Sequence, residues 1–215
     1  MNLAPSEQSP REAWSKRPVY AGVLVGGAST RMGQSKSLLR QEGTTFVERV
    51  LATVRKRAVR TVLLGEGPMP PLPPEVVRLP DVPGLTGPLA GMLAAMRWAP
   101  QACWLFAACD LPMLHAEALD WLLSQRRPGR WAVLPKVVPE RVEPLLALYE
   151  PEALELLENL VAQGLDSPRH IAGEPTVCTP TPPKSLQDCW TNVNTPEERR
   201  RLERARREPP TPSQR

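Results

Sequence analysis

The apolar run VYAGVLV, residues 19–25, leads directly into the polar loop GGASTRMGQSK, residues 26–36. A short run that is apolar throughout is typical of a strand that is buried on both faces of a sheet. Further short apolar runs alternate along the chain with segments of helical periodicity. Such alternation predicts a mostly parallel sheet that is covered by helices on both faces.

The expected elements extend this pattern over most of the chain. Residues 44–57 repeat apolar side chains at i, i+3 and i+4, which predicts an amphipathic helix. Pro and Gly delimit a helix at 151–164, and Thr195 begins a capping-box pattern for a final helix. The other expected strands are 60–65, 75–80, 103–109, 130–135 and 144–150, and the other expected helices are 87–99 and 115–126. The predicted fold class is α/β, a three-layer sandwich around a Rossmann-like, mostly parallel sheet.

Length and composition are those of one soluble domain. The 215 residues are 41% hydrophobic and 23% charged, so the chain can bury a sizeable core. No apolar run approaches the roughly 20 residues that cross a membrane, and the first residues contain no apolar signal segment. We expect a cytoplasmic protein with a single domain at 18–205 and disordered tails at 1–17 and 206–215.

The cysteines and the net charge limit the kinds of metal site and binding partner that are expected. The four cysteines form no CxxC pair and two histidines offer little for a zinc site, so buried free thiols are expected. The net charge of +4 allows acidic ligands, but much of the excess lies in residues 197–215. No basic patch is interleaved with aromatic residues. We expect neither a nucleic-acid nor a membrane partner, and we take the protein to be a monomer.

The loop at 26–36 has the ingredients of a phosphate site without either common fingerprint. GxGxxG is absent, and Lys36 stands three positions after Gly33, which does not fit GxxxxGK[ST]. Gly26 and Gly27 let the backbone approach a ligand, and successive N–H groups in such a loop bind anions. Arg31 and Lys36 add cations for phosphate oxygens. The alternative is a glycine turn with solvated cations.

Two aspartates follow expected strands. Asp81 comes after the strand at 75–80, in a glycine-rich loop where Pro88 begins a helix, and Asp110 ends the apolar strand at 103–109. In open α/β sheets ligands bind at the carboxyl ends of the strands. Mg²⁺ takes one or two carboxylates together with substrate phosphates. The two aspartates and the cationic loop therefore predict a metal–triphosphate site, although each aspartate alone could be a turn or capping residue.

Four motifs in order carry a resemblance to a known family. They are LVGGASTRMGQSK at 24–36, GPLAGM at 87–92, ACDLPML at 108–114 and TNVNTPEE at 191–198. Together they resemble the signatures of nucleotidyltransferases, and in particular the molybdenum cofactor guanylyltransferases of the MobA type. The resemblance spans about residues 18–205, and it implies the same α/β fold.

The resemblance implies roles for individual residues. Leu24, Val25, Gly26 and Gly27 would lie beside the nucleotide, Arg31 and Lys36 on its phosphates, Asp81 in the nucleotide site, Asp110 on Mg²⁺, and Asn192 and Asn194 near the pterin. Asn194 directly precedes a helix cap, so a structural role is its alternative. Val25 stands where the family usually has alanine. The segment GLDSPRHIAGEP, 164–175, matches the family loosely and leaves further pterin contacts unassigned.

The implied reaction is transfer of GMP from GTP to the molybdopterin form of molybdenum cofactor, giving molybdopterin guanine dinucleotide and pyrophosphate. Mg²⁺ would be the cofactor, and molybdoenzymes or their chaperones would be possible recipients of the product. A molybdopterin cytidylyltransferase and a sugar-phosphate nucleotidyltransferase are neighbouring alternatives. A nucleotide-binding adaptor without turnover, and a nucleic-acid binder that uses the basic tail, are alternatives of other classes.

Overall fold

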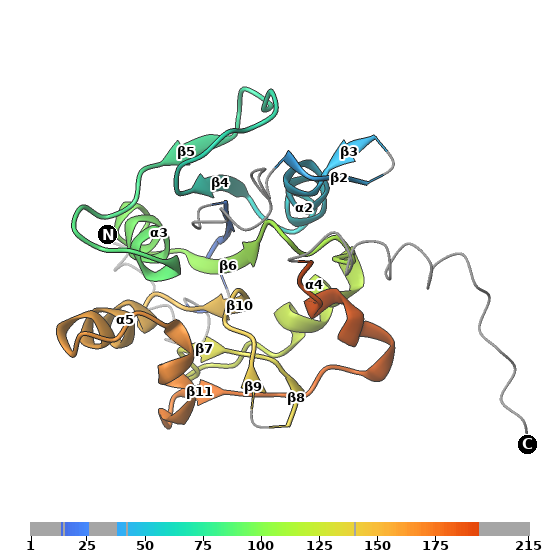
Figure 1. Ribbon diagram of the computed structural model, residues 1–215. Coiled ribbons are helices and arrows are strands. Elements are labelled where there is room, and N and C mark those ends of the chain that lie inside the picture. The colour runs from blue at the N-terminus through green and yellow to red at the C-terminus, as the bar shows by residue number, and fades with distance from the viewer. Residues whose placement is uncertain (1–13, 15, 26–37, 42, 140, 194–215) are drawn as a thin grey trace, which may run out of the picture.

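The computed structural model describes residues 14, 16–25, 38–41, 43–139 and 141–193. Its centre is a seven-stranded sheet in the order β5-β4-β1-β6-β10-β7-β11 (Figure 1). The strands are β1 (Val19–Leu24), β4 (Arg60–Leu64), β5 (Val77–Leu79), β6 (Cys103–Ala108), β7 (Ala132–Val133), β10 (Leu146–Tyr149) and β11 (Val177–Cys178).

One strand of this sheet runs against the others. β1 pairs in parallel with β4 and β6, β5 continues parallel to β4, and β11 is parallel to β7. β10 lies between β6 and β7 and is antiparallel to both, with Leu146 opposite Ala107. The start of β10 therefore lies at the same edge as the ends of the parallel strands. We call this the carboxyl edge.

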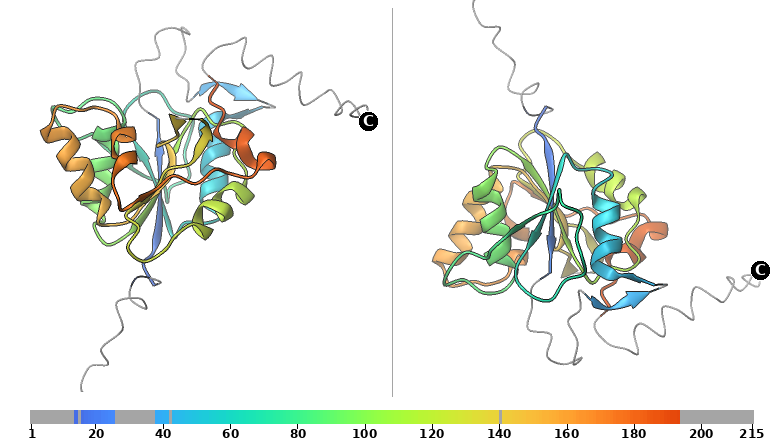
Figure 2. Two further views of the ribbon diagram at one scale, coloured as in Figure 1. Left: turned by 90° about the horizontal axis from the view of Figure 1, so that it is seen from below. Right: turned by 90° about the horizontal axis from the view of Figure 1, so that it is seen from above.

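Helices cover both faces of the sheet, as Figure 2 shows. The first face carries α2 (Phe46–Val54), α4 (Ala116–Ser124) and the 3₁₀ helix η4 (Lys184–Trp190). The second carries α3 (Pro88–Trp98), α5 (Ala153–Ala162) and the 3₁₀ helix η3 (Pro168–Gly173). Alternate residues of β6 enter the two cores, since Leu105 packs on the first face and Phe106 on the second. The predicted three-layer α/β sandwich is confirmed.

Short elements depart from the expected pattern. Helix α2 begins at Phe46 rather than 44, because Thr45 caps it. The Glu48 amide donates to Thr45 Oγ1 at 3.3 Å, and the Thr45 amide donates to the Glu48 carboxylate at 2.8 Å. Two small ribbons were not expected, β2 (Arg40–Gln41) with β3 (Thr44–Thr45), and β8 (Lys136–Val138) with β9 (Arg141–Val142). The expected final helix from Thr195 lies outside the described residues.

The cysteines are free thiols, as expected, and Cys103, Cys109 and Cys189 are buried while Cys178 is half-buried. Burial, followed by the nearby Glu150 carboxylate, raises the pKa of the Cys103 thiol, which keeps it protonated and unreactive.

In the portion of the chain that the structure covers, no helix combines the length and the apolar character required to cross a bilayer.

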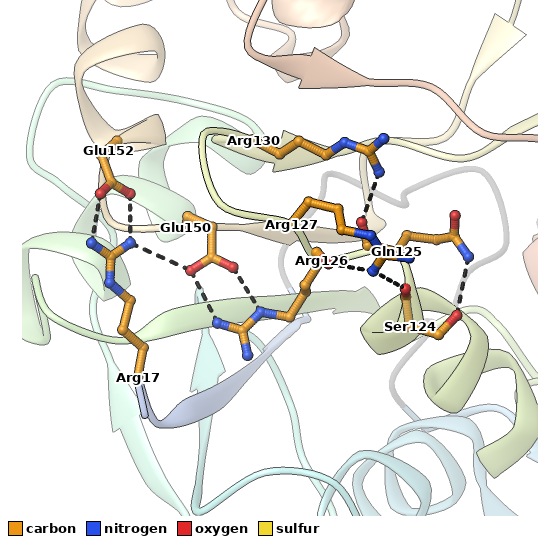
Figure 3. Close-up of polar contacts among 8 residues, drawn as sticks. All are labelled: Arg17, Ser124, Gln125, Arg126, Arg127, Arg130, Glu150 and Glu152. Carbon is orange, nitrogen blue, oxygen red and sulfur yellow. Dashed lines mark hydrogen bonds and ion pairs between the residues drawn. The ribbon is translucent and has the colours of Figure 1, made fainter. Parts of the chain in front are cut away.

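A network of ion pairs closes the opposite, amino edge of the sheet (Figure 3). Arg126 donates to both oxygens of Glu150, at 2.7 and 3.1 Å. Arg17 lies 3.6 Å from Glu150 and donates to Glu152 at 2.6 and 2.8 Å. The guanidinium of Arg126 also stacks 5.0 Å from the ring centre of Trp14. These contacts hold the segment before β1 against the residues that follow β10.

The predicted disorder of residues 1–17 stays a prediction for residues 1–13 and 15, which the structure does not describe.

Gly22 in β1 makes room for the aromatic core of the second face, and we expect Gly22→Ala to destabilise the protein. A Cβ at residue 22 would lie 2.7 Å from Cδ1 of Leu64 and 2.7 Å from Cδ1 of Phe106. The Phe106 ring has little freedom to move, because it stacks on Trp104 and contacts Tyr149 edge-on. Overpacking of this kind costs about 1–3 kcal/mol, partly offset by about 0.5–1 kcal/mol from replacing a strand glycine.

Urea unfolding measures this effect as a lower midpoint at unchanged slope. Gly173→Ala is the matched control, because a Cβ there has no atom within 4 Å. Equal midpoints for the two variants would contradict the packing explanation.

Candidate active site

The end of β1 is held between its neighbours at the carboxyl edge. The Val25 amide donates to the Leu64 carbonyl at 3.0 Å, and the Cys109 amide donates to the Leu24 carbonyl at 3.0 Å. Both Leu24 and Val25 are buried. The chain therefore enters the glycine loop from a fixed position. Gly26, Gly27, Arg31 and Lys36 lie outside the described residues, and their roles stay predictions.

Asp81 lies against helix α3 and the end of β1. A Cβ on Gly91 of α3 would be 3.2 Å from Oδ1 of Asp81 and 3.3 Å from Cδ2 of Leu24. The lack of a side chain at Gly91 thus lets both residues approach the helix. The structure in this way brings together Leu24 and Asp81, two residues that the family resemblance assigns to the nucleotide site.

The surroundings of Asp81 disfavour the ionised form of its carboxyl group. Burial and then the charge of Glu66 raise the pKa of Asp81, while Arg78 acts in the opposite direction. Arg78 also donates to the carbonyls of Gly65 and Gly67, at 3.0 and 3.3 Å, and so anchors the loop after β4. Glu66 and Arg78 were missed from the sequence, because neither lies in a recognisable motif.

Helix α3 begins at this edge. Its N-cap is Gly87, with a φ of 73° that favours glycine, and Pro88 occupies the first turn. A glycine cap has no side chain to bond the first amide groups, so the helix keeps its partial positive charge at the carboxyl edge. The expected start of a helix at Pro88 is confirmed.

Asp110 lies two residues after the end of β6 and is 7% exposed. Its carbonyl accepts a hydrogen bond from the Val193 amide at 3.0 Å. This bond places the Asn192–Val193 segment, which is remote in sequence, next to Asp110. The structure thus brings together Asp110 and Asn192. Asn194 lies outside the described residues.

A cavity of about 320 Å³ opens beside these residues. Leu111 and Asn192, the immediate neighbours of Asp110 and Val193, form part of its wall, and Pro88 of α3 forms another part. The polar side chains of its lining include Arg141, Glu143, Asp166, Arg169 and Asn192. The cavity therefore adjoins Asp110 and provides both hydrogen-bond donors and acceptors. We call it the acceptor cavity.

A second cavity of about 310 Å³ adjoins the first and shares Arg141 and Arg169 with it. Lys136 and Thr179 complete its polar lining among the described residues. The two arginines therefore stand between the acceptor cavity and a more cationic space.

The antiparallel direction of β10 explains why the residues of the acceptor cavity were missed. Only loops that follow strands were expected at the carboxyl edge, whereas residues 141–145 precede a strand. Hydrogen bonds hold this segment in place, since the Ala108 amide donates to the Leu145 carbonyl at 2.7 Å and Tyr149 Oη donates to the Pro144 carbonyl at 2.9 Å. A strand direction is not readable from a short apolar run, so no sequence signal would have placed Glu143 here.

The carboxylate oxygens of Asp110 at this edge are the kind of ligand that Mg²⁺ prefers. Within the described residues, no three His, Cys, Asp or Glu side chains gather as a closed metal site. A buried carboxylate at Asp110 instead offers the few hard oxygen ligands that Mg²⁺ takes when substrate phosphates supply the rest.

This fold, with acidic residues and a helix start at the carboxyl edge of its parallel strands, defines an enzyme of the nucleotidyltransferase class. The chain belongs to the family described as the MobA-like NTP transferase domain, whose model matches residues 21–175.

Curated relatives and solved structures are similar over most of the chain. A probable molybdenum cofactor guanylyltransferase from Bacillus cereus (strain AH187) is 30% identical over a 194-residue alignment, and the match covers 83% of this chain and 93% of the relative. A protein of the same name from Bacillus anthracis is 29% identical over the same shares. Molybdopterin-guanine dinucleotide biosynthesis protein A from Archaeoglobus fulgidus superposes with a TM-score of 0.70 and 26% identity, over 87% of this chain and 98% of that one.

A cytidylyltransferase for 2-C-methyl-D-erythritol 4-phosphate, from Thermus thermophilus, shares the fold at a TM-score of 0.64. Its identity is 19%, over 89% of this chain and all of that one. The common architecture therefore serves nucleotidyltransferases with different bases and acceptors.

Proposed function

We propose that the protein transfers GMP from GTP to the molybdopterin form of molybdenum cofactor, in molybdenum cofactor biosynthesis. The observation that carries this proposal is that residues assigned to the nucleotide lie next to the acceptor cavity at the carboxyl edge. Leu24 accepts a hydrogen bond from the Cys109 amide, Asp81 lies against Gly91 of α3, and the acceptor cavity adjoins Asp110 through Leu111 and Asn192 and is lined by Pro88 of the same helix. The names of the curated relatives support guanine as the base and molybdopterin as the acceptor.

The reaction is an exchange of phosphorus–oxygen bonds. An oxygen of the terminal phosphate of molybdopterin attacks the α-phosphorus of GTP and forms a new bond. The bond from the α-phosphorus to the bridging oxygen breaks, and pyrophosphate leaves with that electron pair. The attacking phosphate is already ionised, so no general base is required. Positioning and charge neutralisation are then the tasks of the protein.

Most of the predicted residues have a task in this scheme. Gly26 and Gly27 would allow the nucleotide to approach the backbone, and Arg31 and Lys36 would bind the departing pyrophosphate. Asp110 would hold Mg²⁺, which when bound supplies charge neutralisation for the phosphates. Asn192, which lines the acceptor cavity, and Asn194 would lie near the pterin substrate.

Pyrophosphate release with each nucleoside triphosphate, with and without molybdopterin, tests the proposal. We expect release that requires both GTP and molybdopterin. A preference for CTP would make the protein a cytidylyltransferase, and release with a sugar phosphate in place of molybdopterin would identify a different acceptor. Binding of GTP without release in the presence of molybdopterin would indicate an adaptor.

A further inference from the structure

The acceptor cavity has a half-buried carboxylate in its wall. The Glu143 side chain is 18% exposed, and one of its oxygens lies 3.1 Å from Nε of Arg141. The Glu143 amide donates to the Pro135 carbonyl at 2.8 Å, which fixes the backbone from which the side chain extends. Glu143 is therefore held at the cavity by its backbone and has carboxylate oxygen available to a ligand.

A structural role does not explain this carboxylate. Arg141 is 67% exposed, and an ion pair of that kind contributes about 0–1 kcal/mol. Burial raises the pKa of Glu143, against the opposing effects of Arg141 and Arg169. The ionised form therefore costs folding free energy at neutral pH. A polar group that is retained at such a cost in a cavity wall is a candidate for ligand binding.

We propose that Glu143 determines specificity for the acceptor by binding the 2-amino-4-oxo edge of its pterin. This inference rests on the proposed function, which makes a pterin the acceptor. That edge presents two adjacent donors, the 2-amino group and N3–H, and a carboxylate accepts from both at once. The neighbouring oxygen O4 is an acceptor, and the guanidinium of Arg141 beside Glu143 carries the matching donors.

The position of Glu143 agrees with the size of the acceptor. The phosphate of molybdopterin must reach Asp110, which adjoins the cavity on the side of Leu111 and Asn192. The pterin is at the opposite end of the molecule from the phosphate, so it needs a partner elsewhere in the cavity wall. Asp166 is the other carboxylate of the lining, but it is exposed and so already solvated by water. Glu143 is the less hydrated of the two and gains more from a ligand's donors.

Two fluorescent probes test how much the 2-amino-4-oxo edge of the pterin contributes to binding. They are pterin-6-methyl phosphate and lumazine-6-methyl phosphate, which differ at position 2, where pterin has an amino group and lumazine has an oxo group with a proton on N1. We expect the wild type to bind the pterin about tenfold more tightly or better, since an unmatched polar pair in a binding site is strongly disfavoured. Titration of the probe's own fluorescence gives both affinities without turnover.

Glu143→Gln is expected to reverse the preference. The glutamine carbonyl accepts from N3–H, and its NH₂ donates to the 2-oxo group of lumazine but opposes the 2-amino group of pterin. The ratio of pterin to lumazine affinity should fall about tenfold or more. Asp166→Asn is the matched control in the same cavity and should keep the wild-type ratio. Thermal unfolding at pH 7 should show no loss of stability in Glu143→Gln, because the neutral side chain removes the cost of a buried charge.

The outcomes distinguish this inference from the proposed function. If the wild type prefers pterin and Glu143→Gln keeps that preference, the role of Glu143 is wrong and the proposed function stands. If both probes weaken equally and the melting temperature falls, Glu143 is structural and the inference is overturned. If the wild type binds GTP but neither probe, the pterin acceptor itself is wrong, and both proposals fail.

Discussion

Asp110→Asn should lower GTP- and molybdopterin-dependent pyrophosphate release by a factor of about 10² to 10³ or more, the scale on which loss of one charge-stabilising group acts. Asparagine keeps the shape of the side chain but removes the negative charge that a bound Mg²⁺ requires. Asp110 is buried just beyond the end of β6, so water would not replace the missing ligand as readily as at an exposed position. The rate is measured at saturating GTP over a range of Mg²⁺ concentrations.

Asp120→Asn is the matched control for this experiment. Asp120 lies on α4 and pairs with Arg57 at the surface, and its side chain is 49% exposed. This variant should release pyrophosphate at the wild-type rate. Undiminished release by Asp110→Asn would show that the predicted metal ligand is wrong. A loss of activity together with a lower melting temperature would instead indicate that Asp110 is needed for folding.

Glu150→Ala should lower the free energy of unfolding by about 3–5 kcal/mol, the typical cost of leaving one partner of a buried ion pair uncompensated. Glu150 and Arg126 have side chains that are only 5% and 12% exposed. Removal of Glu150 leaves the Arg126 guanidinium in the protein without its bidentate acceptor (Figure 3). Arg17 would also lose one of its two carboxylates. Chemical denaturation at pH 7 measures the effect.

Two further variants test whether the loss of stability comes from an unpaired buried charge. Glu150→Leu combined with Arg126→Met removes both charges and should recover most of the stability, since apolar side chains replace buried ion pairs well. Glu158→Ala removes a similar pair with Arg97 at the surface, where the side chains are 45% and 48% exposed. It should cost no more than about 1 kcal/mol. A large loss in the double variant would mean that the network has a role beyond its own charge balance.

The strands of the sheet could largely be predicted from their composition. The segments at 19–25, 60–65 and 103–109 are apolar because both faces of the central sheet are buried, and this burial leaves a pattern that the sequence carries. Shorter strands escaped prediction. β11 has only Val177 and Cys178, and it exists because the backbone of β7 is beside it. Pairing of that kind depends on residues distant in the chain.

Asp81 and Asp110 could be placed at the carboxyl edge from the sequence alone, because each comes shortly after a parallel strand, β5 and β6 respectively. The strand-end rule and the motif spacing needed no three-dimensional information. The alternation of strands and helices was sufficient for the fold class, and the resemblance of four motifs to a known family implied the enzyme class.

The acceptor cavity depended on the tertiary fold for two reasons. The hydrogen bond from Val193 to the Asp110 carbonyl joins two segments whose proximity no local pattern encodes. Glu143 lies at the carboxyl edge only because β10 runs antiparallel to β6. The direction of a strand depends on its neighbours in the sheet rather than on its own residues. The residues predicted to contact the nucleotide are thus encoded locally, while the acceptor cavity results from the packing of the whole domain.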